Sequence, residues 1–132
     1  MYFLDTNVCI YFLKGMYTTL LDRLKAKTPA DIKIASIVKA ELLLGAYKSN
    51  NPEKTKKRVN EFLLPFIILP FDDEASIIYA KIRGMLEKRG NIIGPNDLIL
   101  AATVLVHQGI LITNNVDEFR RIKELKTENW TK

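Results

Sequence analysis

Short apolar segments alternate with longer helical segments along the whole chain, and this alternation restricts the possible folds more than any other feature. Apolar or extended segments predict strands at Tyr2–Leu4, Ile32–Ala35, Phe66–Leu69, Ile110–Thr113 and Lys126–Trp130. Between them the sequence predicts helices at Asn7–Leu13, Thr18–Lys25, Ser36 (as a cap) to Tyr47, Glu53–Leu63, Asp72 or Asp73 (as a cap) to Gly90, Asn96–His107 and Val116–Leu125. This order predicts an α/β fold in which helices sandwich a short, mostly parallel sheet.

Length and composition limit the class of protein. With 132 residues the chain has the size of one domain, and we expect residues 1–132 to form it. One cysteine, Cys9, excludes an intramolecular disulfide, and one histidine, His107, excludes sites that need two histidines. We expect structural roles for both. No apolar run approaches the roughly 20 residues of a membrane span. The N-terminus lacks signal-peptide features, so we expect a cytoplasmic protein.

The charge balance is basic, with 20 Lys and Arg against 15 Asp and Glu, which gives a net charge of +5. Basic residues cluster at 54–58, 88–89 and 120–123, each in or beside a predicted helix. A basic surface is typical of proteins that bind a polyanion such as nucleic acid, or an acidic protein partner. The same balance would also suit a basic surface that only keeps the protein in solution.

Polar residues directly follow two of the predicted strands. Asp5–Asn7 comes after the first strand, and Thr113–Asn115 ends the fourth. In parallel α/β sheets, ligands bind outside the carboxyl ends of the strands, so these clusters should meet although they are far apart in the chain. Each cluster could instead serve only to cap the helix that follows it.

Three acidic residues stand in unusual positions. Glu41 lies among apolar residues of its helix, and glutamate is rarely buried without a partner. Asp97 lies in the first turn of a helix that is apolar almost all round. Glu118 follows Asn115 by one helical turn, so both could face one point. The simpler explanations are solvent exposure for Glu41, the helix dipole for Asp97 and turn formation near Glu118.

Several carboxylates at one sheet edge would repel one another and therefore need a cation. Carboxylate and amide oxygens suit Mg²⁺ or Mn²⁺ rather than zinc or copper. Such a site beside basic helices predicts a centre that cleaves phosphodiesters, because the cation stabilises negative charge and the basic residues hold the polyanion.

Four segments resemble the PIN-domain ribonucleases, and most closely the VapC toxins of toxin–antitoxin pairs. They are Phe3–Asn7, Ser36–Gly45 around Glu41, Gly94–Ala102 around Asp97, and Ile112–Asn115 with Phe119, Ile122, Leu125 and Glu128–Trp130. Together they span essentially the whole chain in the family's order. The resemblance implies a PIN-like fold and Mg²⁺- or Mn²⁺-dependent endoribonuclease activity on RNA such as tRNA. It also implies inhibition by a VapB-type antitoxin and homodimerisation.

The resemblance also implies roles for individual residues. Carried over by position, the core acidic ligands are Asp5, Glu41 and Asp97, and the supporting polar residues are Thr6, Asn7, Asn96 and Thr113. Asp5 and Asp97 would hold the catalytic metal, while Glu41 would complete its shell or orient a second ion. Cleavage would leave a 5′-phosphate and a 3′-hydroxyl.

The sequence departs from the family at Asn115, where many relatives carry an aspartate. Glu118 could supply the missing carboxylate and bind or orient the attacking water, with Asp117 as second choice. A catalytically inactive PIN module that binds RNA or protein is therefore the alternative. A receiver-type signalling domain is disfavoured, because the predicted strand ends offer Ser36, Pro70 and Thr113–Asn114 instead of the required aspartate and lysine.

Overall fold

The computed structural model describes residues 1–132. At its centre is one five-stranded sheet with the order β3-β2-β1-β4-β5, in which all neighbouring strands are parallel. The strands are β1 (Tyr2–Leu4), β2 (Ile32–Ala35), β3 (Ile67–Leu69), β4 (Ile110–Ile112) and β5 (Lys126–Glu128). The predicted fold class is confirmed, and the five predicted strands are present with small differences at their ends.

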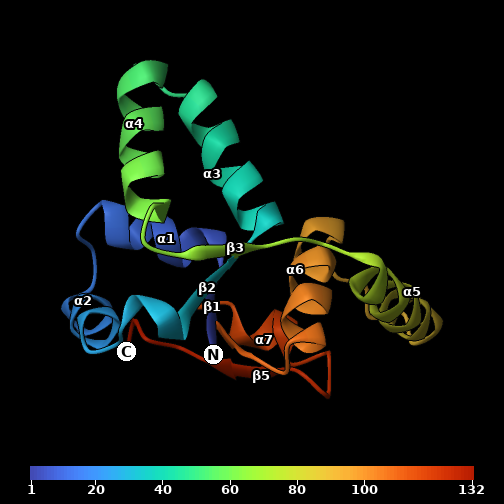
Figure 1. Ribbon diagram of the computed structural model, residues 1–132. Helices are drawn as coiled ribbons and strands as arrows, with labels where there is room; N and C mark the ends of the chain where they lie inside the picture. Colours follow the sequence, from blue (N-terminus) through green and yellow to red (C-terminus); the bar gives the residue numbers. More distant parts are fainter.

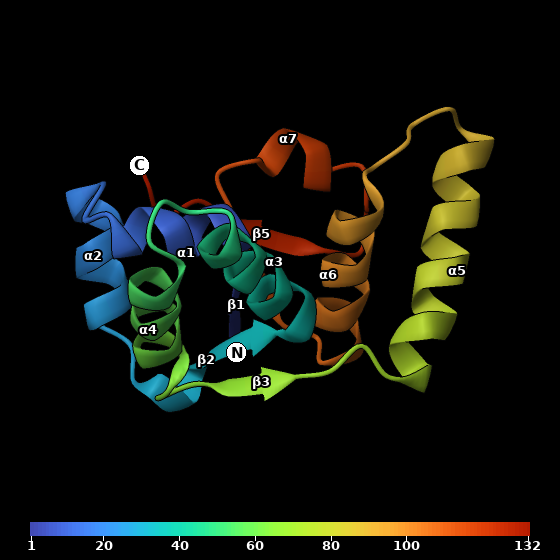
Figure 2. The ribbon, with the colours of Figure 1, turned by 90° about the horizontal axis from the view of Figure 1, so that it is seen from above.

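Seven α-helices surround the sheet. They are α1 (Thr6–Leu13), α2 (Thr18–Lys25), α3 (Ser36–Tyr47), α4 (Pro52–Leu63), α5 (Asp73–Lys88), α6 (Pro95–Val106) and α7 (Val116–Phe119), with a short 3₁₀ helix at Pro29–Asp31. Helices α3 and α4 form a hairpin that projects from the body of the molecule, and α5 stands outside α6 (Figures 1 and 2). None of these helices is both long and apolar enough to span a bilayer.

The core lies between the sheet and α6, whose residues Leu98 and Leu100–Val104 are buried. This confirms the prediction of a central apolar helix. Gly109, just before β4, shows how tightly the core is packed, because a Cβ atom there would lie 2.6 Å from the Phe3 ring. That is closer than carbon atoms tolerate, so only glycine fits between α6 and β1. His107 stacks on Phe3 at 6.0 Å, at the end of α6 opposite Asp97, and Cys9 is fully buried.

Two local predictions were wrong. The helix predicted over Val116–Leu125 ends at Phe119, because the following backbone turns by i→i−3 hydrogen bonds that include Ile122 N–H to the Phe119 carbonyl. This tighter spacing buries Phe119, Ile122 and Leu125 together. Ser36 is not the cap of α3. Its hydroxyl donates to the Leu69 carbonyl at 3.3 Å, so it links α3 to β3 instead. The predicted cap of α5 is confirmed at Asp72, which accepts from Ala75 N–H.

Candidate functional site

The strand order places three chain segments at one edge of the sheet. Strand β1 is central, between β2 and β4, and all three run in the same direction. Their carboxyl ends therefore lie side by side, followed by Asp5, by Ser36 at the start of α3, and by Thr113. The predicted meeting of the two polar clusters follows from this topology, and α6 and α7 bring further acidic residues to the same edge.

Asp5 is the most buried of these acids, with 7% of its surface exposed. Its Oδ1 accepts the Val8 N–H at 2.8 Å, so it does cap α1, as the simpler explanation predicts. The Thr113 hydroxyl, which is also buried, hydrogen-bonds to it. Burial raises the pKa of the Asp5 carboxyl, these hydrogen bonds oppose that rise, and nearby Glu41 adds to it. Capping and a place in the acidic site are therefore compatible.

Glu41 projects from the second turn of α3 and is half-buried. Its Oε1 accepts the Thr6 hydroxyl at 2.6 Å, and its Oε2 accepts the Asn96 side-chain amide at 3.4 Å. These donors come from α1 and α6, so they fix the carboxylate from two sides. Two of the residues predicted to support the site therefore hold one of its acids in place.

Asp97 and Glu118 form a close pair at the start of α6 and on α7. Asp97 is half-buried, and its pKa is raised to about 7 by desolvation and by a hydrogen bond and charge repulsion from Glu118, with smaller effects of Glu41 and Asp5. Asn115 donates its side-chain amide to Glu118 Oε2. Glu118 was predicted to replace the negative charge that Asn115 lacks, and Asn115 thus hydrogen-bonds to that same glutamate.

Other predicted residues are placed differently. Asn7 is exposed on α1, and its side chain makes no hydrogen bond to the acids. Asp117 was the second choice for the missing carboxylate. Its side chain is 94% exposed and pairs with Arg120 at 3.3 Å, because one step along α7 turns it away from Glu118. The sequence did not predict Tyr11, whose hydroxyl accepts from Asn114 at 3.0 Å, since it looks like any apolar residue of α1.

The four residues Asp5, Glu41, Asp97 and Glu118, here called the carboxylate cluster, fit a hard divalent cation by their chemistry. All are oxygen donors, and burial together with the neighbouring carboxylates raises the pKa values of Asp5 and Asp97. No three of these side chains are already close enough to hold one ion between them.

The pKa of Asp97 predicts how the metal-free protein responds to pH. The folded state keeps a proton on Asp97 up to about pH 7, whereas the unfolded chain releases it near pH 3.8. The folded state therefore binds more protons over this interval, so its stability falls as pH rises and levels off above about pH 7. Thermal unfolding in EDTA between pH 5 and pH 8 measures this. Asp97→Asn should show a clearly shallower decrease, and an identical decrease in both proteins would contradict the assignment.

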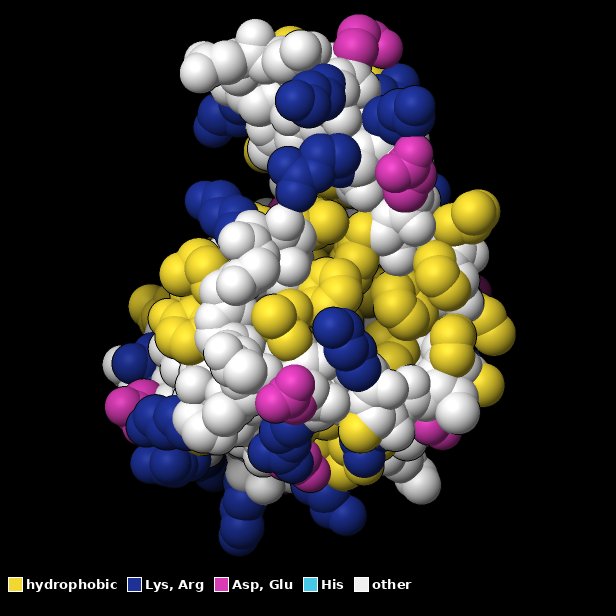
Figure 3. All heavy atoms as spheres, turned by 90° about the vertical axis from the view of Figure 1, so that its left-hand side faces the viewer, with side chains coloured by type: hydrophobic (Ala, Val, Ile, Leu, Met, Phe, Trp, Pro, Cys, Tyr) yellow, Lys and Arg dark blue, Asp and Glu magenta, His cyan; other side chains and the backbone are white.

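Basic side chains lie on the hairpin whose helix α3 carries Glu41. Lys and Arg cover much of the projecting α3–α4 hairpin (Figure 3), where α4 contributes Lys54, Lys56, Lys57 and Arg58. A cavity of about 330 Å³ extends from Glu41 between α1, α3 and α4, and Lys14 and Arg58 line it together with apolar side chains. Two basic side chains thus lie along the cavity that opens from Glu41, where they could contact a polyanion that approaches the carboxylates.

Comparisons with known proteins agree with this geometry. The PIN domain family matches residues 2–125. Ribonuclease VapC2 of Rickettsia felis is 37% identical over 132 residues, which cover 99% of this chain and 98% of that protein. The tRNA(fMet)-specific endonuclease VapC of Salmonella typhimurium is 33% identical, with coverages of 98% and 97%. The crystal structure of DNA-bound VapBC from Salmonella typhimurium aligns with a TM-score of 0.92 at 33% identity, covering 98% of this chain and 97% of that one.

The match to the family spans most of the chain, and relatives above 30% identity cover nearly all of it. The matched residues include β1, β2 and β4, which are followed by Asp5, by α3 and by Thr113, respectively. They also include α6 and α7. The chain therefore belongs to the PIN domain family and, within it, to the VapC ribonucleases.

Proposed function

We propose that this protein is the toxin of a type II toxin–antitoxin pair, and that residues 1–132 act in the cytoplasm as a single Mg²⁺- or Mn²⁺-dependent endoribonuclease domain. The observation that carries this proposal is the convergence of four carboxylates from four separate parts of the chain at one sheet edge. Relatives that are named ribonucleases and cover almost the whole chain support the reaction class.

The metal would be held by Asp5 and Asp97, and Glu41 would complete its shell or orient a second ion. When bound, such an ion supplies positive charge that stabilises the negative charge building up on the scissile phosphate. The hydrogen bonds of Thr6 and Asn96 keep Glu41 in place, so little reorganisation is needed during the reaction.

The attacking water would be bound or oriented by Glu118, which is itself held by Asn115. The oxygen of this water would form a bond to phosphorus while the bond between phosphorus and the 3′ oxygen breaks. The products would be a 5′-phosphate and a 3′-hydroxyl, with the proton from water going to the leaving oxygen or to solvent. Structured cellular RNA such as tRNA is the proposed substrate, and the Salmonella typhimurium relative named for tRNA(fMet) supports this class.

A VapB-type antitoxin is the proposed protein partner, because the related crystal structures hold VapBC complexes. The cavity that joins Glu41 to α4 could seat its tail, since apolar residues such as Ile10, Leu42 and Val59 line it beside Lys14 and Arg58.

We also propose a homodimer. Leu44 on α3 and Ile77 on α5 are 56% and 70% exposed, so both helices offer apolar surface that a second copy could cover. Sedimentation of the isolated protein tests this.

Cleavage of total tRNA and ribosomal RNA by the purified, antitoxin-free protein tests the proposed activity. We expect fragments with Mg²⁺ or Mn²⁺ and none after EDTA, with activity returning when the metal is restored. RNA binding without cleavage under every divalent ion would favour the inactive binding module instead. Asn115 would then be the first suspect, because it replaces a carboxylate that many relatives carry.

A further inference from the structure

A second pocket lies on the far side of Asn115 from Glu118 and is lined almost entirely by polar side chains. It encloses about 240 Å³ between the end of β4, α7 and residues near the C-terminus, and Val116 is its one apolar lining residue. Three asparagines line it, Asn114, Asn115 and Asn129. Pockets for whole small ligands usually measure about 300–1,000 Å³, so this one suits a smaller polar group.

In each asparagine, one of the two side-chain amide groups, the C=O or the NH₂, hydrogen-bonds to a neighbouring residue. The other group has no hydrogen-bond partner. Asn115 donates its NH₂ to Glu118, which leaves its Oδ1 as an acceptor. Asn129 accepts the Thr131 N–H at 2.9 Å and the Thr131 hydroxyl at 2.6 Å, which leaves its NH₂ as a donor. Asn114 donates to Tyr11 and keeps its Oδ1 free. The pocket therefore presents fixed acceptors and a fixed donor.

The pocket is joined to the carboxylate cluster through Asn115. Its side chain contacts Glu118, which pairs with Asp97, and its backbone N–H donates to the Thr113 hydroxyl at 3.0 Å. Thr113 in turn hydrogen-bonds to Asp5. A group bound in the pocket would therefore lie next to a phosphate bound at the cluster.

We propose that this pocket binds one unpaired RNA base next to the cleaved phosphate, and that Asn114, Asn115 and Asn129 select that base by its edge. Every base edge carries hydrogen-bond donors or acceptors in a fixed pattern, and asparagine side chains read such patterns directly. The inference rests on the proposed ribonuclease function and adds a determinant of where the RNA is cut.

The rim of the pocket fits the backbone that accompanies a base. Arg120 there has five N–H donors and uses one of them to pair with Asp117 at 3.3 Å. Both side chains are largely exposed, so the pair is weak and a phosphate can share the guanidinium. An apolar peptide side chain would contact only Val116 there, so the lining does not suit an apolar protein segment.

The test measures base preference with labelled homopolymeric RNA pentamers of A, C, G and U, bound to the full chain with Ca²⁺ in place of Mg²⁺. We expect one pentamer to bind roughly tenfold more tightly than the weakest, the range of a single base-edge contact. Asn129→Asp keeps the acceptor for Thr131 and removes the free NH₂, so the preference should shrink towards none. Asn60→Asp, exposed on α4, makes the same charge change elsewhere and should weaken all four pentamers alike.

Equal binding of all four pentamers by the unaltered protein would overturn the proposal. A base preference that persists in both Asn129→Asp and Asn129→Ala would also overturn it. If these variants kept the preference but lost binding of the antitoxin, the pocket would serve the antitoxin and not a base. Cleavage in Mg²⁺, measured in parallel, separates this inference from the proposed activity. Cleavage without base preference refutes the pocket alone, whereas base-selective binding without cleavage refutes the ribonuclease alone.

Discussion

Replacing Asp5 with asparagine is expected to lower metal-dependent RNA cleavage by about 100-fold or more without unfolding the protein. The amide oxygen of asparagine can still accept the Val8 N–H, so the start of α1 stays capped. The substitution removes one negative charge from the carboxylate cluster, and a metal site that loses a charged ligand loses several kcal/mol of transition-state stabilisation. The rate is measured on the RNA that the unaltered protein cuts, with circular dichroism to show that the fold is kept.

Asp22→Asn is the matched control for this experiment, because Asp22 is exposed on α2, outside the carboxylate cluster. It should cut RNA at the rate of the unaltered protein. If Asp5→Asn also kept that rate, Asp5 would be a helix cap and nothing more, and the proposed metal site would lose its most buried ligand. A reduced rate in both variants would point to an effect of net charge rather than of the site.

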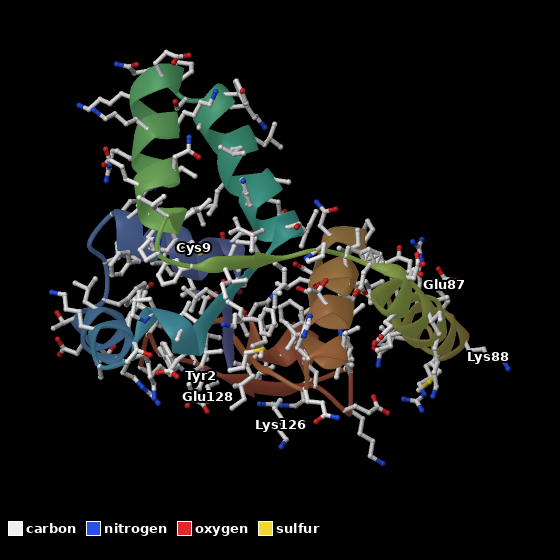
Figure 4. The ribbon with its side chains drawn as sticks, viewed as in Figure 1. Tyr2, Cys9, Glu87, Lys88, Lys126 and Glu128 are labelled. Carbon is white, nitrogen blue, oxygen red and sulfur yellow. The ribbon has the colours of Figure 1, made fainter.

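Replacing Trp130 with alanine is expected to lower the free energy of unfolding by about 3–5 kcal/mol. Trp130 is fully buried although it lies two residues from the end of the chain. Its ring lies 5.3 Å from the Tyr2 ring, the Arg23 guanidinium lies over it at 5.2 Å, and its N–H donates to Glu128 at 2.9 Å. In Figure 4, Tyr2 and Glu128 lie at the same end of the fold. The tryptophan therefore joins the C-terminal segment to β1 and α2.

Thermal or urea unfolding followed by circular dichroism measures this loss, which should lower the Tm by roughly 10–20 °C. Trp130→Phe, which keeps an aromatic ring and loses only the N–H donor and some volume, should cost clearly less than Trp130→Ala. A loss below about 1 kcal/mol for Trp130→Ala would mean that the C-terminal segment contributes little to the core.

The order of strands and helices was readable from the sequence because each depends on neighbouring residues. Apolar runs such as Ile32–Ala35, and turn or capping residues such as Asp72, act over a few positions. The family resemblance rested on short motifs of the same kind. Local predictions failed where tertiary packing overrode the local pattern, as at Ser36, whose hydroxyl donates to the Leu69 carbonyl instead of capping α3. The helix after Val116 was predicted too long, because the backbone after Phe119 turns by i→i−3 hydrogen bonds, and this spacing buries Ile122 and Leu125.

The sequence by itself determined the α/β class, the elements and the acidic residues at issue, since periodicity and motif spacing are properties of the chain. Only the tertiary structure decided how those acids relate to one another. It placed Glu118 against Asp97, turned Asp117 outward to Arg120 and gave Glu41 its two donors. These contacts depend on where α1, α3, α6 and α7 meet at the sheet edge, and packing over the whole fold sets that meeting point.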